Sequence, residues 1–285
     1  MTTPDPIYLD CGGDWPIALL PYGQENTGAP VIMLHGLESH SAWFAQSASY
    51  IAGLGYPVYG MERRGSGHST APRGMCEDYR ELLEDIDSLA SKLLLKHGAT
   101  QFHLLGHCFG AIPATAYACK HPSKLKSLIL ATPAIYTKAS PPLAGRLKVL
   151  WAALSRSELK IPVALKTEWF TDQEEYLDFI RNDLLSLHEA SARLYWEIVR
   201  ARRFIHTNED KLTMPVFMAL AGKDQICNNQ MDSELFNRIR SSEKHYATYP
   251  EAVHILEFST EKSAFFRDLN KWFSKVDKHA LEGAL

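Results

Sequence analysis

The 285-residue sequence predicts an α/β protein with a mostly parallel sheet and helices on both of its faces. Three observations lead to this fold class. Short apolar runs alternate with longer segments whose apolar residues have helical spacing, which is typical of repeated strand–helix–strand units. Several of the runs contain no alternating polar residues, as expected for strands that are buried on both faces. The alternation is interrupted once, between residues 135 and 210.

The elements before this interruption follow one another in a regular order. Two apolar runs around Cys11 to Asp14 predict a hairpin, and Gly98 predicts the end of the long helix that precedes it. In chain order we expect the hairpin over residues 7–22, a strand at 31–34, a helix at 41–54, a strand at 57–61, a helix at 79–97, a strand at 102–105, a helix at 111–120 and a strand at 125–130.

The interrupting segment predicts a separate layer of structure. From Ile135 to about Asp210 it is helical in pattern, rich in Trp, Leu and Tyr, and free of strand-like runs. We therefore expect a core domain formed by residues 1–134 and 211–285, with residues 135–210 inserted as a helical cap, or lid. After the cap we expect a strand at 214–220, a helix to about 240, a strand at 244–249, a helix at 261–276 and a frayed end at 278–285.

Composition excludes several classes of protein. A net charge of −3 with 22% charged residues gives no basic surface for nucleic acid, so no nucleic-acid partner is expected. The five cysteines are scattered, with no Cys-x-x-Cys pair, which favours free thiols in a reducing compartment. The sequence has neither a signal peptide nor a run long enough to span a bilayer, so it predicts a cytoplasmic protein and indicates no particular oligomeric state.

The stretch from Gln101 to Gly110 predicts a reactive cysteine. An apolar run ends there in Gly-x-Cys-x-Gly and a helix of small residues follows, which outlines a strand, a sharp turn and a helix with Cys108 at the apex. Gly106 and Gly110 leave room for neighbouring backbone, and the helix N-terminus favours a thiolate. An ordinary turn with a buried cysteine would have the same local sequence, so the remaining chain must decide.

Two further residues supply what a cysteine nucleophile needs, namely a base and an acid that orients it. Asp224 directly follows a predicted buried strand, and His254 follows the last strand. In a parallel sheet the carboxyl ends of the strands lie at one edge, where sites form. Alone, Asp224 would be a turn residue and His254 an exposed loop histidine. Together with Cys108, in the chain order nucleophile, acid and base, they predict a catalytic triad.

These residues belong to a longer set of motifs, which are Leu34-His35-Gly36-Leu37, Arg64 to Ser69, Leu105 to Gly110, Gly222-Lys223-Asp224 and His254. With them the chain resembles the α/β-hydrolases, and most of all the monoacylglycerol lipase and lysophospholipase branch. The resemblance implies the α/β-hydrolase fold and a triad of Cys108, His254 and Asp224. It also implies an oxyanion hole made by the backbone N–H groups of Leu37 and Phe109. The chain departs from the family at Cys108, which is usually serine, and at Glu62, which replaces a common aspartate.

The function expected from this resemblance is acyl transfer through a covalent acyl-Cys108 intermediate. The apolar cap segments 147–154 and 176–196 favour a small hydrophobic acyl ester or thioester, free or bound to a carrier, although packing of the cap would also use them. Water is the expected acceptor. Three alternatives stay open: transfer or cyclisation onto an amine, thiol or carbon nucleophile, a serine hydrolase with an engineered cysteine, and a non-catalytic ligand receptor. We expect no cofactor, and no metal because no helix carries a His-x-x-x-His or His-Glu-x-x-His pair.

Overall fold

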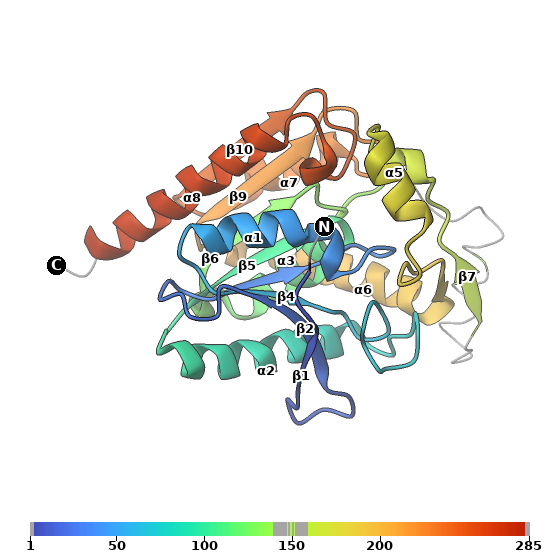
Figure 1. The fold of residues 1–285 in the computed structure, drawn as a ribbon, viewed down its shortest axis with the longest axis horizontal. Coiled ribbons are helices and arrows are strands. Elements are labelled where there is room, and N and C mark those ends of the chain that lie inside the picture. Colours follow the sequence, from blue (N-terminus) through green and yellow to red (C-terminus); the bar gives the residue numbers. More distant parts are fainter. Residues whose placement is uncertain (1–2, 139–146, 148, 150, 152–158, 283–285) are drawn as a thin grey trace.

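The computed structural model describes residues 3–138, 147, 149, 151 and 159–282. They form a sheet of eight strands in the order β1-β2-β4-β3-β5-β6-β9-β10 (Figure 1). Its strands are β1 (Ile7–Leu9), β2 (Ile17–Tyr22), β3 (Val31–Leu34), β4 (Val58–Met61), β5 (Phe102–His107), β6 (Leu125–Ala131), β9 (Val216–Ala221) and β10 (Lys244–Tyr249). The β2 strand is antiparallel to both of its neighbours, and every pair from β4 to β10 is parallel.

Helices cover both faces of the sheet, as predicted (Figure 1). They are α1 (Ala45–Gly53), α2 (Tyr79–His97), α3 (Ala111–Lys120), α7 (Asn229–Arg238) and α8 (Lys262–Glu282). One core lies between the sheet and α1 and α8, and the other lies under α2, α3 and α7. Within β3, Ile32 and Leu34 belong to one core while Val31 and Met33 belong to the other, which explains why this strand shows no polar alternation.

The boundaries of α2 have identifiable local causes. The Asp78 side chain accepts a hydrogen bond from the Arg80 N–H at the start of the helix. Gly98 ends it with φ of +60°, a left-handed conformation that a residue without Cβ adopts freely. The predicted range 79–97 is therefore confirmed, as is the role of Gly98.

The segment between β6 and β9 differs in part from the prediction. It contains α5 (Glu174–Arg181) and α6 (Ala192–Asn208), but also β7 (Lys160–Pro162) and β8 (Glu189–Ser191), which form a separate antiparallel ribbon. Each of these strands has three residues, too few for hydrophobic periodicity to reveal. Figure 1 shows α5, α6 and β7 beside the carboxyl edge of the sheet. The predicted apolar segment 147–154 lies largely outside the described residues.

The C-terminal helix extends further than expected. We predicted an end near residue 276 and fraying from 278, whereas α8 continues to Glu282; residues 283–285 lie outside the described part. All five cysteines are free thiols, as predicted. None of the helices in the described ranges combines the length and the apolar composition that crossing a bilayer requires.

Candidate active site

Cys108 lies at a strained turn between β5 and α3. Its φ is +49°, and it is one of two non-glycine residues with positive φ in the described part of the chain. Such backbone costs free energy and persists only where the surroundings enforce it. A Cβ on Gly106 would lie 2.7 Å from the Gly110 carbonyl oxygen, and one on Gly110 would collide with the Leu34 carbonyl. The tight approach of strand, turn and helix therefore requires both glycines, as the sequence pattern indicated.

His254 and Asp224 lie together at the carboxyl ends of β10 and β9. The ring Nδ1 of His254 is 2.8 Å from Asp224 Oδ2, and both side chains are fully buried. Asp224 Oδ1 accepts hydrogen bonds from the backbone N–H groups of Ile226 (2.8 Å) and Cys227 (2.9 Å). The carboxylate is thus held by one side chain and two amides, and it fixes the orientation of the ring.

The other ring nitrogen of His254 faces the cysteine. Nε2 is buried and has no hydrogen-bond partner within the described ranges, while the Cys108 thiol interacts with this side of the ring. Burial opposes a charge on the ring, but Asp224 and Cys108 outweigh it and raise the pKa of His254 to about 10. The sequence-predicted triad residues are therefore gathered at one place in the structure.

A second thiol, which the sequence did not point to, lies beside the first. A hydrogen bond from Cys227 is the largest cause that lowers the pKa of Cys108, and His254 adds to it, so that the pKa falls to about 5 despite burial. Burial and the neighbouring Cys108 raise the pKa of Cys227 well above its ordinary value. Cys227 Sγ is also 3.1 Å from the Thr132 carbonyl oxygen, a second acceptor for its proton. One thiol is thus stabilised as a thiolate and the other as a hydrogen-bond donor.

The loop after β3 passes directly beside the Cys108 sulfur. A Cβ on Gly36 would lie in ordinary contact with Sγ, 3.7 Å away, and would approach Ser39 Oγ to 2.8 Å. Several hydrogen bonds hold the loop, among them those from the Gly36 N–H to Ser39 Oγ (2.9 Å) and from Arg63 Nη2 to the Leu37 carbonyl (2.9 Å). Ser39 and its neighbour Glu38 are both buried.

A mainly apolar cavity of about 530 Å³, counting the space at its mouth, opens above the sulfur. Its described lining combines core residues with residues of the inserted segment: Leu37, Cys108, Phe109, Ala134, Thr137, Val163, Ala164, Leu165, Tyr195 and Ile226. Arg202 Nη2 donates to the Ala134 carbonyl (2.9 Å). This arginine therefore supports the cavity wall.

Comparisons with known proteins agree with this architecture. A family model described as serine aminopeptidase, S33 (Hydrolase_4) matches residues 25–261. The monoacylglycerol lipase of Mycolicibacterium smegmatis is 24% identical over 246 residues, which cover 85% of this chain and 86% of that protein. The monoglyceride lipase of Homo sapiens is 23% identical over 260 residues, covering 87% and 84%.

Two solved lipase structures have the same fold as this chain. The monoacylglycerol lipase of Paleococcus ferrophilus superposes with a TM-score of 0.81 at 21% identity, covering 91% of this chain and 99% of that one. A soluble variant of the monoglyceride lipase of Saccharomyces cerevisiae, in complex with a substrate analog, gives a TM-score of 0.83 at 19% identity, covering 97% and 96%. The resemblance indicated by the motifs, and the fold that it implied, are confirmed.

Proposed function

Since the chain belongs to the serine aminopeptidase S33 (Hydrolase_4) family of α/β-hydrolases, we propose that it is an enzyme that cleaves carboxylic ester bonds of a hydrophobic acyl substrate. The observation that carries the proposal is the environment of His254. Its Nδ1 is engaged by Asp224, and its buried Nε2 has no partner in the described part other than the neighbouring Cys108. A nucleophile, a base and an orienting acid are thus in contact.

In the proposed mechanism, the Cys108 thiolate attacks the acyl carbonyl and forms a C–S bond. The backbone N–H groups of Leu37 and Phe109 stabilise the oxyanion. His254 donates its Nε2 proton to the leaving alkoxide, whose bond to the acyl carbon breaks, and a thioester remains. The ring, now neutral, accepts a proton from water as the water attacks the thioester; the C–S bond then breaks, which releases the carboxylic acid and restores the Cys108 thiolate beside the protonated ring. Asp224 keeps the other ring nitrogen protonated throughout. Apart from the substrate and water, each step of the mechanism uses only groups of the chain itself.

For the substrate class we propose a single-chain acyl ester such as a monoacylglycerol. The cavity walls above Cys108 are aliphatic and aromatic, and Thr137 and Tyr195 supply the few polar groups. Relatives across 85% of the chain are named as lipases of this kind. We also propose that residues 135–210 act as a cap over the core formed by residues 1–134 and 211–285, because Val163 and Leu165 of that segment line the cavity.

Cys227 bears on the alternatives for position 108. Cys227 and His254 lower the pKa of Cys108, which suits a thiolate nucleophile, and a serine hydrolase with an engineered cysteine stays an alternative. A non-catalytic receptor is disfavoured because binding alone would not require the ordered His254 and Asp224 pair. Transfer to an amine, thiol or carbon nucleophile stays an alternative, because thioesters accept all three. A reducing, cytoplasmic location stays a prediction based on the free thiols.

The test is the intact mass of the protein after incubation with p-nitrophenyl esters of increasing chain length. We expect one acyl adduct on the wild type, none on Cys108→Ala, and a slower one on His254→Ala. Cys11→Ala is the matched control, since it removes a thiol outside the cavity, and it should acylate like the wild type. An adduct that survives in Cys108→Ala would contradict the proposed nucleophile. Wild-type binding without acylation or turnover would support the receptor instead.

A further inference from the structure

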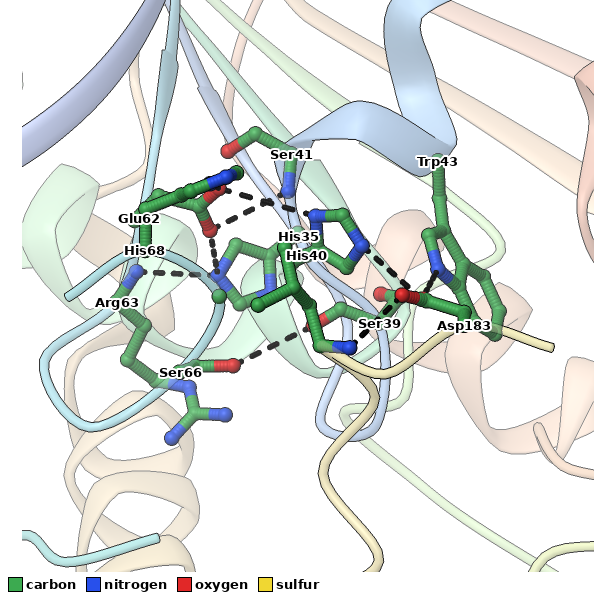
Figure 2. Close-up of polar contacts among 12 residues, drawn as sticks. His35, Ser39, His40, Ser41, Trp43, Glu62, Arg63, Ser66, His68 and Asp183 are labelled. Carbon is green, nitrogen blue, oxygen red and sulfur yellow. Dashed lines mark hydrogen bonds and ion pairs between the residues drawn. The ribbon is translucent and has the colours of Figure 1, made fainter. Parts of the chain in front are cut away.

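A cluster of two histidines and a carboxylate lies where the loops after β3 and β4 meet (Figure 2), and none of the three residues lines the Cys108 cavity. His40, Glu62 and His68 present ligand atoms that all lie within 4.8 Å of one another. Glu62 Oε1 is 3.3 Å from His68 Nδ1 and 3.9 Å from His40 Nδ1. His40 comes from the loop after β3, and Glu62 and His68 come from the loop after β4, so no helical spacing in the sequence predicts the cluster.

His40 has an unsatisfied nitrogen aimed into this cluster. The residue is 3% exposed. Its Nε2 is 3.0 Å from Asp183 Oδ2, an acceptor, so Nε2 carries a proton. Its Nδ1 has no hydrogen-bond partner in the described part of the chain and faces Glu62. Figure 2 shows the ring between the two carboxylates. His40 Nδ1 and Glu62 Oε1 therefore face each other in a buried space without a hydrogen bond between them.

Glu62 has only long hydrogen bonds in the described part of the chain, and one of them joins Oε1 to His68 Nδ1 at 3.3 Å. Its side chain is fully buried, and Oε2 accepts only a 3.3 Å hydrogen bond from the Ser41 N–H. His35 Nε2 is 3.4 Å from Oε2, but it already accepts the Arg63 N–H (3.0 Å) and so offers no proton. His35 Nδ1 carries that proton and donates to the Gly36 carbonyl (2.8 Å). A buried carboxylate with such long hydrogen bonds is stabilised by a positive charge close to it, so its surroundings favour a bound cation.

We propose that His40 Nδ1, Glu62 Oε1 and His68 Nδ1 bind one Zn²⁺ ion. Two imidazole nitrogens and one carboxylate oxygen are a ligand set that zinc accepts, and metal–ligand bonds of about 2.0–2.2 Å in a tetrahedral site place ligand atoms roughly 3.3 Å apart. The 3.3 and 3.9 Å separations found here need only small side-chain rotations. Water completes the coordination on the side of His68, whose side chain is 28% exposed and leaves a path for the ion.

Asp183 supplies the outer contact that zinc-binding histidines usually have. It accepts the proton of His40 Nε2 and thereby leaves Nδ1 as the free electron pair. Asp183 belongs to the inserted segment and also accepts from Trp43 Nε1. The ion would therefore connect the loop beside Cys108, the end of β4 and the inserted segment. Its role is structural, since Glu62 and His68 do not line the cavity.

The experiment measures zinc binding to chelator-treated full-length protein by calorimetry, and its effect on the melting temperature. We expect one Zn²⁺ per chain and a zinc-dependent rise in Tm. His68→Asn should weaken zinc affinity by about a hundredfold or more, because it removes a ligand. His188→Asn is the matched control, since it removes an imidazole with a 72% exposed side chain outside the cluster. Equal zinc affinity in wild type and His68→Asn, or no binding to the wild type, would overturn the proposal.

A second arm separates this cluster from the thiols of the active site, where Asp224, Cys227 and His254 also offer ligand atoms within 4.8 Å of one another. Co²⁺ replaces Zn²⁺ as a coloured probe, and a thiolate ligand gives it an intense sulfur-to-metal charge-transfer band. We expect only weak visible d–d bands, unchanged by prior alkylation of Cys108 and lost in His68→Asn. A charge-transfer band that alkylation abolishes would place the metal at the thiols and refute the site at His40.

Discussion

The ionisation state of Cys108 can be measured directly by its rate of alkylation at low pH. An ordinary thiol, with a pKa of about 8.5, is about 0.3% thiolate at pH 6. With its pKa lowered to about 5, Cys108 is about 90% thiolate at the same pH, a gain of about 300-fold in the reactive form. A less basic thiolate is also less nucleophilic, which removes about 30- to 40-fold of that gain. Iodoacetamide should therefore modify Cys108 about tenfold faster than an ordinary thiol at pH 6.

The assay follows modification of each cysteine peptide by mass spectrometry between pH 5 and 8.5. The rate at Cys108 should stay nearly constant down to about pH 6 and fall only below it. Cys11 is the internal control, since burial raises the pKa of its thiol and its rate should fall about tenfold for each pH unit across this range. Cys227→Ala removes the largest cause of the low pKa, so its Cys108 profile should move toward higher pH. A wild-type Cys108 profile parallel to that of Cys11 would refute the thiolate.

Further predictions test the turn, a buried acid and the cavity. Gly110→Ala should lower the free energy of unfolding by about 1–3 kcal/mol in urea titrations, because the added Cβ meets backbone, whereas Gly53→Ala, with nothing within 4 Å, should not lower it. Burial raises the pKa of Asp232 to about 8, above the unfolded value near 3.9. At pH values between these two pKa values the folded state binds one more proton than the unfolded state, so the free energy of unfolding falls as the pH rises from about 3.9 to about 8. Asp232→Asn should remove up to about 1.4 kcal/mol per pH unit of that slope, and an unchanged slope would contradict it. Leu165→Trp should reduce the hydrolysis of long acyl esters about tenfold relative to that of short ones, because the larger side chain fills the space of about two methylenes in the cavity. An equal effect on long and short esters would place the acyl chain elsewhere.

The proximity of Asp224 and His254 could be predicted because a parallel sheet converts chain order into spatial proximity. Asp224 and His254 are 30 residues apart, yet they follow the neighbouring strands β9 and β10, whose carboxyl ends meet at one edge. Gly98 and the helix before it could be predicted for a different reason, since the conformation of a glycine cap is a local property. Both predictions rest on rules that hold within one element or between adjacent strands.

The features that the sequence did not reveal depend on loops that meet across the fold. Cys227 follows β9 by a few residues and contacts Cys108 only because the loop after β9 folds back over the turn. His40 and Asp183 are separated by 143 residues and meet through the inserted segment. The β7 and β8 strands contain three residues each and depend on their pairing with one another. No periodicity or motif encodes contacts of this kind.

In the proposed mechanism, the choice between hydrolysis and transfer to another acceptor follows from how the charge on His254 changes during the cycle. Before acylation, the Cys108 thiolate and Asp224 together keep the ring protonated, so it acts first as an acid toward the leaving group. The thioester carries no charge, so one of the two causes of the high pKa disappears when it forms. The ring then becomes a base for whichever nucleophile lies against Nε2. Because this step does not distinguish water from an alcohol, amine or thiol, the acceptor must be selected by the cavity walls, where Thr137 and Tyr195 provide the polar groups.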